Sequence, residues 1–239
     1  DRYASIAQLI RDARTYAKDD KSTILAAYLK PFREGKREKA LPAAKLLMGS
    51  IVSNGATHLL TGENQTALTQ GYYSDYTKFS DSEAEAIRRY YDYMIRYENL
   101  FFDPELQDVT MTHTGWDNYE YQCTSHKVSS YGEAGKIWMI LREKDYRKCI
   151  YLLNLCGQSE DYWNEGKEEP NIQKDIKFTV QVDTPVEKIC FSTPDGENMD
   201  AIELSFTERA TKTGKFIDFT VPSLNYWTTI WIDTRKETI

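Results

Sequence analysis

Two short apolar runs, separated by helical patterns, constrain the fold of the first hundred residues most strongly. Residues 22–29 (STILAAYL) and 56–61 (ATHLLT) are nearly continuous apolar runs, which are typical of strands buried on both faces of a parallel sheet. Helical spacing precedes, separates and follows them, over 3–18, 41–52 and 82–102. The order helix, strand, helix, strand, helix is that of a (β/α) barrel or a doubly wound sheet.

A pair of parallel strands leaves both edges of its sheet unpaired, so two strands complete neither fold. We therefore expect the remaining strands to come from sequence upstream of Asp1 or from another chain. The chain also opens at Asp1 directly in an amphipathic pattern, with no signal-peptide pattern in front of it. These features predict a fragment or a processed product of a larger protein.

The second part of the chain has the pattern of an antiparallel β structure. From about Asp108, β-branched and aromatic residues alternate with polar ones, and turn sequences such as Thr193-Pro194-Asp195-Gly196 recur at short intervals. Many short strands at such spacing predict a β-sandwich. The expected strands are 109–111, 120–124, 136–142, 148–155, 176–182, 186–191, 201–207, 215–221 and 227–232.

The charge balance argues against several classes of partner. The chain has 30 Lys and Arg residues against 37 Asp and Glu residues, a net charge of −7, and no stretch gathers enough positive charge to follow a phosphate backbone. The most basic stretch, 30–39, is interrupted by Glu34 and Glu38 and is interpreted as a solvated loop. We expect neither nucleic acid nor an anionic membrane as a partner, and no apolar run of the sequence is long enough to span a bilayer.

The sequence gives little support to a metal site or a disulfide. The four cysteines, at 123, 149, 156 and 190, lack the C-x-x-C spacing of a zinc site, and buried thiols are preferred to a bridge. Oxygen atoms at 117–118 and 195–200 are candidate calcium ligands, but their spacing favours turns instead. We therefore expect no metal and no cofactor.

Several short stretches together resemble glycoside hydrolase family 66, which comprises the dextranases and the related cycloisomaltooligosaccharide glucanotransferases. Their order and spacing carry the resemblance, which covers nearly the whole chain. The stretches are Ile24-Leu25-Ala26-Ala27-Tyr28, Gly55 to Glu63 (GATHLLTGE), Gly71-Tyr72-Tyr73, Arg89 to Leu100 (RYYDYMIRYENL), Cys149 to Gly157 with Trp163, and Val221-Pro222-Ser223-Leu224 with Tyr226-Trp227.

The resemblance implies an α/β plus all-β fold. Residues 1–102 are expected to be the C-terminal portion of a (β/α)8 catalytic barrel, and 103–239 an antiparallel β-sandwich domain. The seventh and eighth barrel strands map to 22–29 and 56–61, and the closing helix maps to 82–102. The family hydrolyses α-1,6-linked glucan with retention, which requires an Asp nucleophile and a Glu acid/base about 5 Å apart. Both belong to earlier strands in the family, so no catalytic residue is assigned here and the isolated chain is expected to be inactive.

The resemblance further implies that the parent protein is a secreted or cell-surface bacterial endo-α-1,6-glucanase, with α-1,6-glucan or isomaltooligosaccharide as its substrate. The missing N-terminal part of the same barrel is a further expected partner. Active sites of such barrels lie at the carboxyl ends of the strands. This rule selects as candidate substrate-binding residues Tyr28, His58, Glu63, Asn64, Tyr72 and Tyr73, with Lys30 as a weaker candidate.

Each candidate has an alternative role. The ring nitrogens of His58 suit sugar hydroxyls, but a buried histidine bonded to the backbone fits the same pattern. Glu63 orients a hydroxyl or is a solvated acid. Tyr72 and Tyr73 stack on a glucose ring or pack against the sandwich domain.

Two other classes of function stay open on the sequence alone. A carbohydrate-binding module would use an aromatic platform of Trp116, Tyr119, Trp163 and Trp227, although Trp227 also falls in a strand pattern that a core requires. A structural interaction domain would instead dock its first hundred residues on a partner.

Overall fold

Two compact units make up the protein. The computed structural model describes residues 1–17, 21–33, 35, 37–70, 77–115 and 117–235. The first unit comprises Asp1–Pro104 with Gly157–Pro170, and the second comprises Glu105–Cys156 with Asn171–Ile239. The segment 157–170 thus belongs to the first unit, whereas the sequence division at 102/103 assigned it to the second. In the part of the chain that the structure describes, no helix combines the length and the apolar character needed to cross a membrane.

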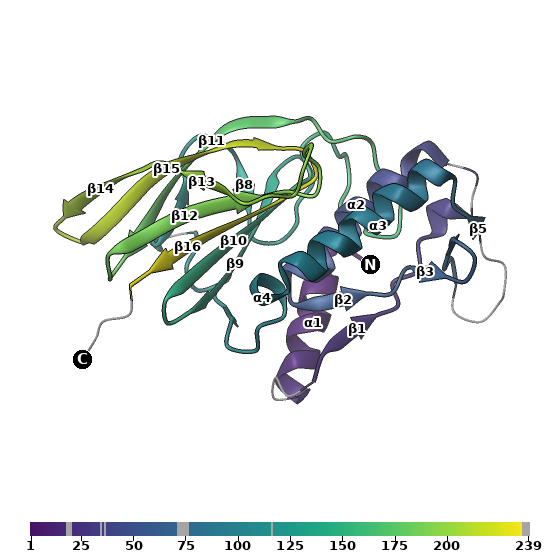
Figure 1. Ribbon diagram of the computed structural model, residues 1–239, viewed down its shortest axis with the longest axis horizontal. Helices are drawn as coiled ribbons and strands as arrows, with labels where there is room; N and C mark the ends of the chain where they lie inside the picture. The colour runs from purple at the N-terminus through teal and green to yellow at the C-terminus, as the bar shows by residue number, and fades with distance from the viewer. Residues whose placement is uncertain (18–20, 34, 36, 71–76, 116, 236–239) are drawn as a thin grey trace. The chain divides into compact units, whose positions relative to one another are not determined.

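A parallel pair of short strands organises the first unit (Figure 1). Strands β1 (Thr23–Leu25) and β2 (Ala56–His58) pair in register, and the amide of Leu59 extends the ladder by donating to the carbonyl oxygen of Leu25 at 2.8 Å. The predicted apolar runs therefore do form parallel strands. The regular pairing is shorter than the predicted run 22–29, which leads into a 3-10 helix, η1 (Lys30–Phe32), with Pro31 in its first turn.

The two faces of this strand pair differ in burial. Side chains alternate between faces along extended chain, and on one face Ala27, Leu29 and Ala56 are buried. On the other face the side chain of Ile24 is 64% exposed and that of Leu59 is 44% exposed. The prediction of burial on both faces is therefore wrong for β1, because the described residues cover only one face of the pair.

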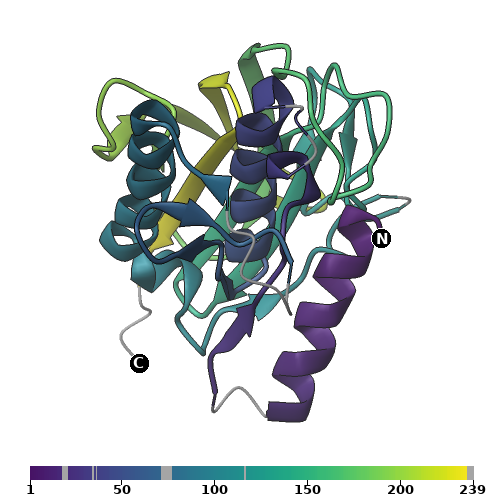
Figure 2. The same ribbon diagram turned by 90° about the vertical axis from the view of Figure 1, so that its right-hand side faces the viewer.

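Three long helices accompany the strand pair. Helix α2 (Arg37–Ser53) lies between α1 (Tyr3–Ala17) and α3 (Asp81–Arg96), as Figure 2 shows. A capping box begins α3: the Ser80 hydroxyl accepts from the Glu83 amide at 3.3 Å, and the Glu83 carboxylate accepts from the Ser80 amide at 2.7 Å. The predicted long helix breaks at Tyr97, whose backbone is not helical, and continues as α4 (Glu98–Phe101).

A small antiparallel sheet follows β2 directly. Its strands are β3 (Thr61–Gly62), β4 (Thr66–Ala67) and β5 (Thr77–Lys78), paired in the order β3-β4-β5. The turn between β3 and β4 contains Asn64 and Gln65, both with positive φ, at 55° and 59°. The chain therefore forms a hairpin over residues 61–67.

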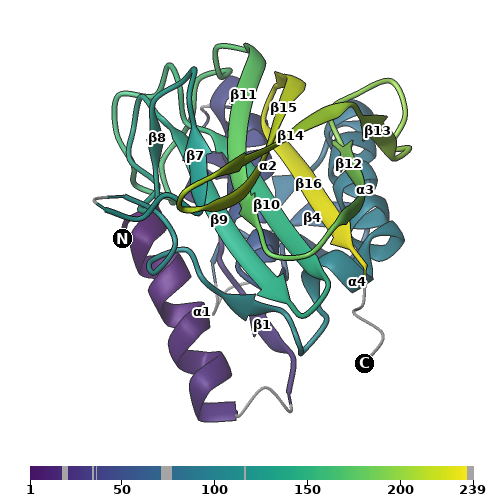
Figure 3. The ribbon, with the colours of Figure 1, turned by 90° about the vertical axis from the view of Figure 1, so that its left-hand side faces the viewer.

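The second unit consists of two mainly antiparallel sheets around one hydrophobic core (Figure 3). The larger sheet has the order β13-β12-β16-β10-β9-β6, with β8 parallel to β9, and the smaller has the order β14-β15-β11-β7. Both sheets contribute to the core, for example through Ile150 and Ile230 of the larger and Phe178 and Val221 of the smaller. The strands are β6 (Gln107–Asp108), β7 (Tyr121–Cys123), β8 (Val128–Ser129), β9 (Ile137–Lys144), β10 (Arg147–Asn154), β11 (Gln173–Val182), β12 (Val186–Ser192), β13 (Ile202–Leu204), β14 (Phe206–Thr211), β15 (Gly214–Leu224) and β16 (Trp227–Thr234).

Two predicted strands differ from the structure. The run 201–207 contains the whole of β13 and the start of β14, because the chain leaves the larger sheet after Leu204 and enters the smaller sheet at Phe206. The run 109–111 is a turn, in which the Asp108 carboxylate accepts from the Thr110 amide at 2.9 Å.

The four cysteines are free thiols. Cys149 and Cys190 are buried and pair with Trp231 from the two sides of β16, so the central strand separates them. Burial raises the pKa of the Cys149 thiol to about 11, which makes it unreactive at neutral pH.

Candidate functional site

The carboxyl ends of β1 and β2 meet at one edge of the parallel pair, which we call the strand-end edge. It comprises residues 26–33 after β1, residues 59–70 with β5 after β2, and the first turns of α2 and α3. In α/β folds with parallel strands, ligand sites form at this edge because the following loops converge there. The candidate residues selected from the sequence differ in where they lie relative to this edge and in how exposed they are.

Tyr28 is the best placed of these candidates. It follows β1 by three residues and, by alternation along the extended chain, lies on the open face with Ile24. Its side chain is half-buried, which leaves part of the ring available to a ligand. The structure thus places Tyr28 at the strand-end edge and on the uncovered face.

His58 lies instead on the buried face. Its Nε2 donates to the carbonyl oxygen of Ala27 at 2.9 Å, which ties the ends of the two strands together. Its Nδ1 is buried and has no hydrogen-bond partner among the described residues. Burial lowers the pKa of the ring to about 4, although the Ala27 carbonyl acts in the opposite direction. A sugar contact at His58 has no support in this geometry, whereas the alternative of a buried histidine bonded to the backbone fits it.

Glu63 and Asn64 occupy the exposed turn between β3 and β4. The carbonyl oxygen of Glu63 accepts from the Thr66 hydroxyl at 2.6 Å, which fixes the turn and leaves the carboxylate in solvent. Both residues therefore remain accessible to a ligand, at the tip of a hairpin. Tyr72 and Tyr73 lie outside the described residues.

The basic stretch 30–39 is not the solvated loop that the sequence suggested. It contains η1 and the start of α2, and its described cations are paired with side chains distant in sequence. Periodicity alone does not reveal this pairing. The pairs are Lys30 with Glu165 at 3.4 Å, Arg33 with Gln70 at 3.0 Å, Arg37 with Glu83 at 2.6 Å, and Lys39 with Glu168.

Arg37 joins three segments of the strand-end edge. Its guanidinium donates to the carbonyl oxygens of Phe32 and Lys78, at 3.4 and 2.6 Å, and to the buried carboxylate of Glu83. It also lies over the Phe32 ring, 5.1 Å from the ring centre. Beside it is an open groove of about 590 Å³, lined by Phe32, Arg33, Gly35, Arg37, Thr77, Lys78, Phe79, Ser80 and Glu83.

We expect Arg37→Lys to lower the free energy of unfolding by about 1–2 kcal/mol, because lysine keeps the charge but not the planar fork that reaches three acceptors. Urea unfolding followed by circular dichroism measures the change. The matched control is Arg88→Lys on α3, an exposed position, where we expect a change within about 0.5 kcal/mol. Equal effects of the two replacements would contradict the role of Arg37.

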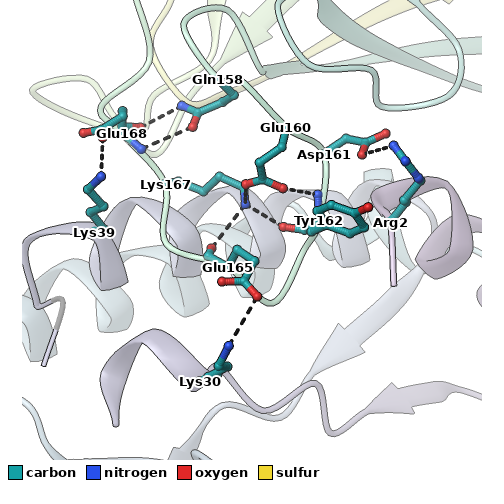
Figure 4. A network of polar contacts seen from close by, with 10 residues as sticks. All are labelled: Arg2, Lys30, Lys39, Gln158, Glu160, Asp161, Tyr162, Glu165, Lys167 and Glu168. Atoms are coloured by element: carbon teal, nitrogen blue, oxygen red, sulfur yellow. Dashed lines mark hydrogen bonds and ion pairs between the residues drawn. The ribbon is translucent and has the colours of Figure 1, made fainter. Parts of the chain in front are cut away.

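Segment 157–170, which we call the strap, lies against the strand-end edge (Figure 4). Its backbone bonds to Asp1 and Tyr3, before and at the start of α1, and to Lys39 in the first turn of α2. Its side chains reach Lys30 after β1: Asn164 Oδ1 accepts from the Lys30 amide at 2.9 Å. Sequence reasoning missed this segment because it has no periodic pattern and its partners lie far away along the chain.

Lys167 is a fully buried charge within the strap. Its ammonium donates to the Glu160 carboxylate at 2.6 Å and to the carbonyl oxygens of Tyr162 and Glu165 at 2.5 and 3.2 Å. These acceptors use all three of its donors. Its Nζ also lies 5.8 Å from the centre of the Tyr3 ring. Burial raises the pKa of the Tyr3 hydroxyl, so that this ring stays neutral beside the ammonium.

The proposed aromatic platform of the second unit is not assembled. Trp163 belongs to the strap in the first unit, Trp227 is fully buried, and Tyr119 is exposed, while Trp116 lies outside the described residues. In the loop 195–200, which was also a candidate for calcium, the Asp195 carboxylate accepts hydrogen bonds from two backbone amides, both at 3.0 Å. Among the described residues there is no group of three or more His, Cys, Asp or Glu placed to hold a metal.

A family model, two curated relatives and a solved structure match this chain. The model of glycosyl hydrolase family 66 matches residues 1–231. Two curated cycloisomaltooligosaccharide glucanotransferases of Niallia circulans are 28% and 26% identical over 193 and 191 residues, which cover 80% and 79% of this chain. The chain spans 19% of the length of each, about a fifth.

A solved structure has the same fold over most of the chain. It is a cycloisomaltooligosaccharide glucanotransferase of Paenibacillus sp. complexed with cycloisomaltoheptaose. The TM-score is 0.70 at 23% identity, over 79% of this chain and 27% of that one. At this identity the likeness concerns the fold alone.

Proposed function

This chain belongs to glycosyl hydrolase family 66, and on that premise we propose that it is the C-terminal portion of a secreted bacterial endo-α-1,6-glucanase. In this proposal the first unit supplies the last two strands and the closing helix of a (β/α)8 barrel, and the second unit is the β-sandwich that follows. The substrate is α-1,6-glucan or an isomaltooligosaccharide. The site of action is outside the cell or at its surface.

One observation carries the barrel assignment: the uneven burial of the strand pair. A face of two parallel strands that exposes Ile24 and Leu59 is unusual for such strands, which are normally covered on both sides. The inward side chains of the other strands would cover such a face in a closed barrel, since the interior of a barrel is filled with side chains. Tyr28 then lies at the barrel mouth, next to the loops that hold Glu63 and Asn64.

The proposal assigns binding to this chain and bond cleavage to the rest of the barrel. Retaining glycosidases need one carboxylate to attack the anomeric carbon and a second carboxyl group to protonate the leaving oxygen. Earlier strands of the barrel would supply both. Tyr28 offers an aromatic face and a hydroxyl to a glucose unit, and the exposed hairpin with Glu63 and Asn64 offers polar groups for sugar hydroxyls.

Cyclisation of the glucan is a second candidate activity, because both curated relatives are named glucanotransferases. The two reactions share a glycosyl-enzyme intermediate and differ in the acceptor. The acceptor is water in hydrolysis and the other end of the same glucan in cyclisation. Analysis of the products that the parent enzyme makes from dextran separates them: linear oligosaccharides indicate hydrolysis and cyclic ones indicate transglycosylation.

We expect the isolated chain to bind isomaltooligosaccharides but not to hydrolyse dextran. Isothermal titration measures binding, and Tyr28→Ala should weaken it about fivefold or more, because a stacked ring contributes on the order of 1 kcal/mol. The control is Tyr16→Ala on α1, at a side chain that is 88% exposed and remote from the strand-end edge. Turnover of dextran, or equal binding by both variants, would contradict the proposal.

A further inference from the structure

The backbone of the strap bonds to the rest of the first unit at two separate points. Near the start of α1, the Tyr3 amide donates to the Asp161 carbonyl oxygen at 3.0 Å, and the Trp163 amide donates to that of Asp1 at 3.2 Å. In the first turn of α2, the carbonyl oxygen of Lys39 accepts from the Lys167 amide at 3.1 Å. These are backbone bonds, so the strap has a fixed register against both helices.

Side-chain pairs reinforce these two points and add a third, at Lys30. Arg2 pairs with Asp161 and lies over the Tyr162 ring, 4.9 Å from its centre. Lys30 pairs with Glu165, and Lys39 pairs with Glu168. Figure 4 shows these contacts on successive parts of the strap. The exposed ion pairs add little energy individually, but together with the backbone bonds they define one orientation.

The strap is also held from within. Lys167 gathers Glu160, Tyr162 and Glu165 around its ammonium, and the Gln158 side chain exchanges two hydrogen bonds with the backbone of Glu168, at 2.7 and 3.2 Å. The contacts of Lys167 join residues in the middle of the strap. The bonds between Gln158 and Glu168 join its two ends. The strap is therefore a preformed loop and not a flexible connection.

Asn164 is the point where this loop meets the backbone after β1. Its Oδ1 accepts from the amide of Lys30, two residues after Tyr28 and directly before Pro31. Leu29 is extended, with φ −99° and ψ 102°, and Lys30 begins η1, so the bond at the Lys30 amide fixes the backbone where the extended chain after β1 ends. Asn164 therefore holds the backbone two residues after Tyr28.

We propose that the strap positions the β1 side of the glucan cleft, with Asn164 as a positioning residue that acts on Tyr28 through the Lys30 backbone. The proposal rests on the proposed function for the cleft itself. It adds that the cleft depends on a segment more than a hundred residues away in sequence, which the chain inserts between β10 and β11 of the other unit.

The test compares Asn164→Leu, which removes the acceptor at similar size, with Asn164→Asp, which keeps an Oδ acceptor, in the full chain. Hydrogen exchange followed by NMR reports the Lys30 amide, with the Leu47 amide in the core of α2 as an internal reference. We expect Asn164→Leu to accelerate exchange at Lys30 about tenfold or more with Leu47 unchanged, and Asn164→Asp to stay near the wild type. Asn198→Leu, which removes a similar side-chain bond to the Asp200 amide in the second unit, is the control.

Titration with isomaltooligosaccharides completes the test. Asn164→Leu should weaken binding about as much as Tyr28→Ala, and Asn164→Asp should restore it. Unchanged exchange at Lys30, equal acceleration at Lys30 and Leu47, or faster exchange with unchanged affinity would each overturn the proposal. If the wild-type chain binds no glucan, the proposed function fails, and the exchange measurement alone decides whether the strap holds the Lys30 backbone.

Discussion

Lys167→Met is expected to lower the free energy of unfolding of the first unit by about 2–4 kcal/mol, one of the two largest effects that we predict. Methionine keeps the length and the apolar stem of lysine but donates no hydrogen bonds. The replacement leaves the Glu160 carboxylate and the carbonyl oxygens of Tyr162 and Glu165 without the donor they share. Removing one partner of a buried ionic cluster costs more than the pair contributes, because the remaining groups stay desolvated.

Urea unfolding monitored by tryptophan fluorescence measures the loss. Lys212→Met, at an exposed position between β14 and β15, is the matched control and should change stability by less than about 0.5 kcal/mol. A loss below about 1 kcal/mol at Lys167 would show that its ammonium is not a structural centre of the strap.

The strap marks the limit of what the sequence predicts about this fold. The parallel pair, the three long helices and the Ser80 capping box all have local signals: apolar runs, period 3.6 and cap spacing. The strap has none, since its structure depends on polar contacts between residues far apart in the chain. In the sequence, Glu160 and Lys167 look like ordinary surface charges. Only the fold shows that Lys167 pairs with Glu160 and lies next to Tyr3 and Lys39.

The candidate site was predictable in part for a related reason. The rule that ligands bind at the carboxyl ends of parallel strands led to Tyr28 and to the turn with Glu63 and Asn64, which do lie there. The face on which His58 lies was not predictable. In ATHLLT the apolar residues do not alternate regularly with the polar ones, so the sequence does not show which side chains face the helices and which face the open side.

Acid should destabilise the first unit through His58. The ring has a pKa of about 4 in the folded protein against an ordinary value of 6.5, because burial disfavours its charged form. Between these two values the unfolded chain binds a proton that the folded chain does not, so the free energy of unfolding falls as the pH falls. The contribution is absent above about pH 7 and reaches a loss of about 2–3 kcal/mol by pH 4.5.

The comparison that isolates this loss is wild type against His58→Gln, with unfolding measured at several values between pH 7.5 and 4.5. Glutamine still has an amide that can donate to the Ala27 carbonyl oxygen, but it takes up no proton. Carboxylates titrate alike in both proteins, so their contributions cancel in the difference. The advantage of the wild type over the variant should therefore shrink by about 2–3 kcal/mol over this range, whereas His126→Gln should follow the wild type. Parallel curves for wild type and His58→Gln would mean that the folded protein accepts a proton at His58, and that the buried tie between the two strand ends tolerates a charge.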